Sequence, residues 1–169
     1  MLRRTIRKLA NLCGWMAAAF LAGIAVATAL QIIARQFGKP VETTELSGFF
    51  LAAATFLALA HTFVMGGHVR LGLVADFAPK GLRRPFEIWA CVFAALIVGY
   101  AGWHMTAFTY ETYRFGDLSP GLLAVPLWIP QSAICVGLWV MLLSIIEQAS
   151  LVLSGQLADY ETNVDSAVE

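Results

Sequence analysis

The stretch Leu12–Ala34, "LCGWMAAAFLAGIAVATALQIIA", contains no aspartate, glutamate, lysine or arginine. A helix needs about 20 apolar residues to cross a hydrocarbon core about 30 Å thick, so this stretch is long enough to span a membrane. It is also longer than the apolar run of about 7–15 residues in a cleaved signal peptide. We therefore expect it to be retained as a first transmembrane helix.

Three further stretches lack charged residues in the same way: Leu46–Val69, Ile88–Tyr110 and Leu118–Ile146. The chain is 59% hydrophobic and 13% charged, against about 45–50% and about 25% in soluble domains. Runs this long and rich in Ala and Leu satisfy their backbone groups as helices rather than as barrel strands. The sequence predicts a single all-α membrane domain over residues 1–169, with four spans at about 12–33, 46–65, 86–108 and 127–146.

Lysine and arginine in the short flanks of the spans predict the orientation of the chain. An N-terminus in the cytoplasm places most of them inside: Arg3, Arg4, Arg7, Lys8, Arg70, Lys80, Arg83 and Arg84 inside, against Arg35, Lys39 and Arg114 outside. We therefore expect both termini in the cytoplasm. The acidic C-terminal tail, residues 150–169, is expected to be solvated and mobile.

The segment between the second and third spans is predicted to lie on the membrane surface. Gly66 and Gly67 suit the left-handed conformation that follows a helix C-terminus. Apolar residues from Val69 to Phe77 then alternate irregularly with Arg70, Asp76 and Lys80. This pattern favours a short amphipathic segment in the headgroup region.

Polar residues near the outer ends of the spans have several possible partners. Gln31 is expected to hydrogen-bond to a neighbouring helix. Arg35 and Glu45 bracket the same interface, so they can form an ion pair or can reach separately for water. Pro126 is expected at the start of the fourth span, where a proline is tolerated.

Few residues in the sequence could catalyse a reaction or bind a metal ion or cofactor. His61 and His104 raise the possibility of a haem between two helices, but at 1.5 Å rise per residue their depths differ by roughly 15 Å. His68 has no partner at metal-ligand spacing, and with net charge +0 and no long basic tract nothing indicates nucleic acid. We expect no catalytic, metal, cofactor or substrate site and no enzyme activity, and a haem- or quinone-binding redox anchor stays as the alternative function.

The centre of each span also lacks the charged residues that mark ion and proton pathways, and the chain lacks the broken, polar mid-membrane segments expected where a transporter binds its substrate. A carrier acting alone is therefore disfavoured. The remaining interpretation is a membrane scaffold or accessory subunit whose apolar surface contacts another protein.

Four features in order across the chain carry a resemblance to a known family. Gln31 to Arg35 closes the first span, "TTEL" opens the second, "GGHVRLGLV" follows it, and "LLAVPLWIPQ" opens the fourth. In their order and spacing the chain resembles the small permease subunit (DctQ-like) of tripartite ATP-independent periplasmic (TRAP) transporters.

The resemblance implies a division of labour in the bacterial inner membrane. A large permease subunit carries the substrate and sodium sites and moves by an elevator mechanism. A soluble periplasmic protein delivers an organic acid, such as a dicarboxylate or a sialic acid. The small multi-pass subunit braces the large one and otherwise contacts membrane lipid.

By the same resemblance, six residues become candidates for structural or partner contacts. Arg35 and Glu45 would fix the outer helix junction, and His68 and Arg70 would anchor the cytoplasmic segment. Pro126 and Trp128 belong to the motif that opens the fourth span, and the segment Tyr110–Leu127 is expected to touch the periplasmic protein. The alternative is that these residues only fix membrane depth.

Overall fold

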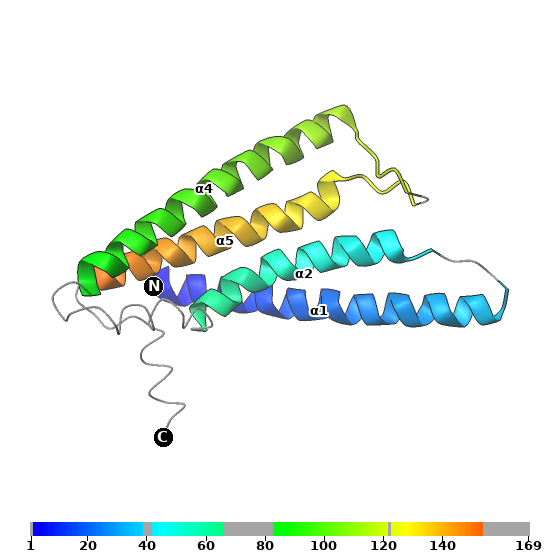
Figure 1. Cartoon of the computed structure of the whole chain (residues 1–169), viewed down its shortest axis with the longest axis horizontal. Coiled ribbons are helices and arrows are strands. Elements are labelled where there is room, and N and C mark those ends of the chain that lie inside the picture. The colour runs from blue at the N-terminus through cyan, green and yellow to red at the C-terminus, as the bar shows by residue number, and fades with distance from the viewer. Residues whose placement is uncertain (1, 39–41, 66–82, 122, 154–169) are drawn as a thin grey trace, which may run out of the picture.

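The computed structural model describes residues 2–38, 42–65, 83–121 and 123–153, most of which form four long helices (Figure 1). The helices are α1 (Leu2–Gln36), α2 (Thr44–Val64), α4 (Arg83–Phe115) and α5 (Trp128–Leu153). Each is long and apolar enough to cross a membrane. The predicted all-α fold with four spans is therefore confirmed.

The helices extend beyond the charge-free runs. The helix α1 begins at Leu2 rather than near residue 12, α4 continues to Phe115, and α5 continues to Leu153. The backbone bonds of a helix do not stop where the apolar residues do, so charged turns add to each span. Residues 150–153 of the expected acidic tail are thus helical, whereas residues 154–169 and the expected amphipathic segment lie outside the described residues.

The helices form a row in the order α1, α2, α5, α4. The helix α2 packs against both α1 and α5, and α5 also packs against α4. Over the 18 residues compared in each span, α5 is the most buried, with 39% of these residues buried, and α4 is the least, with 6%. The hydrophobic core lies between α1, α2 and α5, around Cys13, Ala17, Leu57, Ala60 and Val140.

Glycines allow the three core helices to approach one another closely. A Cβ on Gly137 of α5 would collide with the backbone of Phe56 in α2. A Cβ on Gly23 of α1 would lie 3.0 Å from the ring of Phe50 in α2, and Ala27 beside it is 6% exposed. Small residues at such positions let membrane helices pack backbone to backbone.

The helix α4 is joined to α5 by side-chain hydrogen bonds within the apolar region. The indole Nε1 of Trp139 donates to Thr106 Oγ1 at 3.0 Å. The hydroxyl of Thr109 lies 3.3 Å from the sulfur of Cys135. These bonds satisfy polar groups that lipid cannot, so they favour this pairing of α4 with α5 over separation.

Candidate partner-binding surfaces

At one end of the row α1 and α4 end and α2 and α5 begin, and we call it the hairpin end (Figure 1). There Thr43, the residue before α2, donates its hydroxyl to Gln31 Oε1 of α1 at 2.7 Å. The same hydroxyl lies 3.4 Å from the carbonyl of Ala27. The prediction that Gln31 bonds to a neighbouring helix is therefore confirmed, and this bond ties the end of α1 to the start of α2.

The connection from α4 to α5 is a closed loop. Gly116 ends α4 with a φ of 69°, a conformation that a glycine adopts without steric cost. The amide of Ser119 then donates to the carbonyl of Val125 at 2.9 Å, and the amide of Leu127 donates to the carbonyl of Asp117 at 3.1 Å. These two bonds fold the loop on itself, so its tip reaches across to the start of α2.

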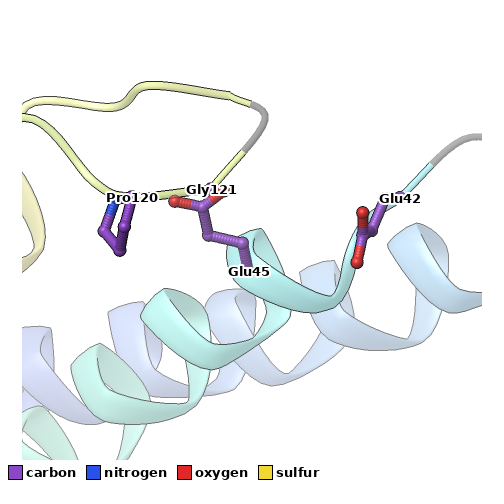
Figure 2. Close-up of a pocket in the computed structure, with 4 residues that line it drawn as sticks. All are labelled: Glu42, Glu45, Pro120 and Gly121. Atoms are coloured by element: carbon purple, nitrogen blue, oxygen red, sulfur yellow. The ribbon is translucent and has the colours of Figure 1, made fainter.

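Glu45 meets the tip of this loop. It lies in the first turn of α2, where the helix dipole favours a carboxylate, and it points toward Pro120 and Gly121 (Figure 2). Gly121 has no side chain, and a Cβ there would occupy the position of the Glu45 carboxylate. Glu45 and Glu42 line a pocket of about 330 Å³ with Pro120 and Gly121.

Arg35 and Glu45 do not form an ion pair in the part of the chain that the structure describes. Arg35 is exposed near the end of α1. Glu45 Oε1 is buried and has no hydrogen-bond partner among the described residues. The two side chains are separate in the structure, and the Glu45 carboxylate lies against Gly121 rather than beside Arg35.

Trp128 is the first residue of α5, and Pro126 lies two residues before it. The carbonyl of Pro126 accepts a hydrogen bond from the amide of Ile129 at 3.1 Å and so begins the helix. The Trp128 ring packs edge-on against Tyr113 of α4, with centroids 5.6 Å apart. His68 and Arg70 lie outside the described residues.

The two histidines considered as haem ligands have separate surroundings. His61 packs against Gly14 of α1, where a Cβ would lie 2.7 Å from the imidazole. His104 is exposed on α4, and its ring lies 4.3 Å from that of Tyr100. Their helices are separated by α5 in the row, and no cluster of metal-ligating side chains occurs among the described residues.

Sequence reasoning did not single out the partners of these side chains. Thr43, Gly121 and Gly14 each contact a residue that was noticed, namely Gln31, Glu45 and His61. A polar residue near the end of a span indicates that its side chain needs a hydrogen-bond or packing partner. It does not indicate which residue of another helix or loop contacts it, because that depends on how the helices are rotated about their axes.

Comparison with known proteins identifies the family. Residues 24–155 match the family described as tripartite ATP-independent periplasmic transporters, DctQ component. The chain is 22% identical over 100 residues to the ectoine TRAP transporter small permease protein TeaB of Halomonas elongata. That match covers 57% of this chain and 52% of the relative, so the chain spans about half the length of the curated relative it matches. No solved structure matches the chain. The family match covers most of the chain, including the last part of α1 and the whole of α2, α4 and α5, and the chain therefore belongs to the DctQ family of TRAP transporter components.

Proposed function

We propose that the chain is the small membrane subunit that braces the large permease subunit of a TRAP transporter during sodium-coupled uptake of an organic acid. The observation that supports this role is the open row of helices, in which α1 and α4 have 11% and 6% of their spans buried. Apolar helices so little covered by their own chain have surface to share with another membrane protein. A brace requires such a surface.

The hairpin end is proposed to face the periplasm and to meet the substrate-binding protein. The closed loop lies there over the first turn of α2, with the Glu42–Glu45 pocket between them (Figure 2). Basic flanks at the opposite end favour the cytoplasm for that side. His68 and Arg70, which follow α2 at that opposite side, are proposed to anchor the connection at the membrane surface.

The organic acid itself is proposed to bind the large subunit and not this chain. Organic acids are the substrates to assay, and ectoine joins them because the relative is named for it. Deletion of this chain is expected to reduce uptake of a radiolabelled substrate to background, and re-expression is expected to restore it. Immunoblotting for the large subunit separates loss of transport from loss of the partner.

Co-purification provides the second test. An affinity tag on this chain is expected to retain a much larger membrane protein in a fixed ratio from detergent-solubilised membranes. Normal uptake without this chain, or purification of the chain with no larger membrane partner, would disprove the proposed function.

A further inference from the structure

The helix α4 exposes a row of large side chains on the side turned away from α5, and we call it the open face of α4. Its members recur at spacings of three, four or seven residues and therefore share one side of the helix. Each is 52–70% exposed. They are Trp89, Phe93, Leu96, Tyr100, Trp103 and Tyr110.

Two polar groups lie on or beside this face deep in the apolar region. Tyr100 is 70% exposed, and the neighbouring His104 is also exposed. The charge-free run Ile88–Tyr110 has its midpoint near residue 99. At 1.5 Å rise per residue, Tyr100 lies about 1.5 Å and His104 about 7.5 Å from that midpoint. Neither side chain reaches water from there, because the hydrocarbon half-thickness is about 15 Å.

No hydrogen bond is recorded for the Tyr100 hydroxyl or the His104 imidazole among the described residues, which show only their ring contact at 4.3 Å. Lipid tails offer neither donors nor acceptors, so both groups would be unsatisfied against lipid. A protein partner with hydrogen-bonding side chains removes that cost.

Exposed hydroxyls elsewhere in the spans are satisfied within their own helices. Thr28 donates to Ile24 O at 2.9 Å, Thr55 donates to Leu51 O at 2.8 Å, and Thr62 donates to Ala58 O at 2.9 Å. A tyrosine hydroxyl is too far from its own backbone for such a bond. The middle of α1 exposes aliphatic residues such as Leu21 and Val26, which lipid covers without cost.

We propose that the open face of α4 is the surface on which a transmembrane helix of the large permease subunit packs. This inference rests on the proposed function. The partner helix presents a serine, threonine, asparagine or glutamine side chain opposite Tyr100 and His104, and small residues opposite the rings. A component of a tripartite transporter must meet another membrane component, and of the two least buried spans α4 is the one with unsatisfied polar groups near its midpoint.

Site-specific photo-crosslinking in the assembled complex tests the location. The photoreactive amino acid p-benzoylphenylalanine is placed at Leu96 or Trp103 on the open face, and at Leu21 on α1 as the matched control. Leu21 is similarly exposed, at 54% against 66% and 67%. Crosslinks to the large subunit are expected from Leu96 and Trp103 and not from Leu21.

The remaining outcomes separate the inference from the proposed function. A complex that co-purifies but crosslinks only from Leu21, or not at all from α4, overturns the inference and leaves the proposed function standing. Crosslinks from α4 to a second copy of this chain overturn the choice of partner. If no large subunit co-purifies with the unaltered chain, the proposed function fails and the inference fails with it.

Removal of the Tyr100 hydroxyl and the His104 imidazole tests whether these polar groups contribute to binding of the large subunit. The double variant Tyr100→Phe with His104→Leu is expected to retain about threefold less large subunit on the affinity tag. The control Phe93→Leu with Leu96→Met changes the same face without removing a polar group and is expected to retain nearly all of it. Unchanged retention in the double variant contradicts the inference. Thermal unfolding of the isolated chain checks that both variants are folded.

Discussion

At the scale of single residues, the hairpin end depends on side chains that meet across elements. Gln31 and Thr43 join α1 to α2 by a bond of 2.7 Å. Glu45 of α2 lies against Gly121 of the closed loop. The sequence indicated Gln31 and Glu45, whereas the packing of the helices determined their partners.

We expect Thr43→Val to destabilise the chain by about 1–3 kcal/mol, because Gln31 Oε1 loses its donor in a partly buried position. Thr28→Val is the matched control, since Thr28 is exposed and bonds only to its own backbone. The measurement is thermal or denaturant unfolding of the purified chain in detergent. Equal losses of stability in the two variants would show that the hydrogen bond between Thr43 and Gln31 does not stabilise the fold.

Charge reversal at Arg35 and Glu45 tests the separation of these side chains. No ion pair joins them in the described part of the chain, so the double variant Arg35→Glu with Glu45→Arg is expected to show the product of the two single fold-losses in uptake. Rescue of uptake in the double variant would mean that the charges couple in the assembled transporter.

At the scale of elements, close approach of helices sets the stability of the fold. The helix α5 lies between α2 and α4, and Gly137 is where its backbone meets that of α2. Glycine is required there by the neighbouring backbone of Phe56 and not by a turn. The pairing of α4 with α5 depends instead on Thr106 and Trp139.

We expect Gly137→Ala to destabilise the chain by about 1–3 kcal/mol, because the added methyl group forces α2 and α5 apart. Gly99→Ala in α4 is the control, since its Cβ would meet Leu142 at an ordinary 3.7 Å. That change is expected to be neutral or slightly stabilising. The comparison is made by the unfolding temperatures of both variants in the same detergent, and similar losses would contradict the assigned contact.

At the scale of the whole molecule, the four helices form an open row rather than a closed bundle. The start of α1 and the end of α5 lie at the end opposite the hairpin end (Figure 1). An even number of crossings places both ends on one side of a membrane. The basic residues in the first turns of α1 and at the start of α4 favour the cytoplasm for that side.

We expect a green fluorescent protein fused after residue 169 to fluoresce, because that end of the chain is predicted to stay in the cytoplasm. Alkaline phosphatase fused at the same place is expected to be inactive, since it needs the periplasm to fold. The reverse pattern would invert the orientation of the whole row and place the hairpin end in the cytoplasm.

The sequence alone determined that this protein lies in a membrane and that it crosses the membrane with helices. Charge-free runs such as Leu12–Ala34 cannot leave their backbone groups unpaired in lipid, so each run contains a spanning helix whatever its neighbours are. The order of the four motifs likewise indicated the family before any contact was known. Only the ends of the helices differed, because charge marks the limit of the apolar region and not of the helix.

The tertiary structure decided which helix lies beside which. Lipid is as apolar as leucine, so hydrophobic pattern does not select neighbours within a membrane; close packing and a few polar bonds do. Contacts such as Gly137 with Phe56 and Trp139 with Thr106 depend on the rotation of two helices at once. The same rotations place Tyr100 and His104 on an open face, which one-dimensional spacing does not reveal.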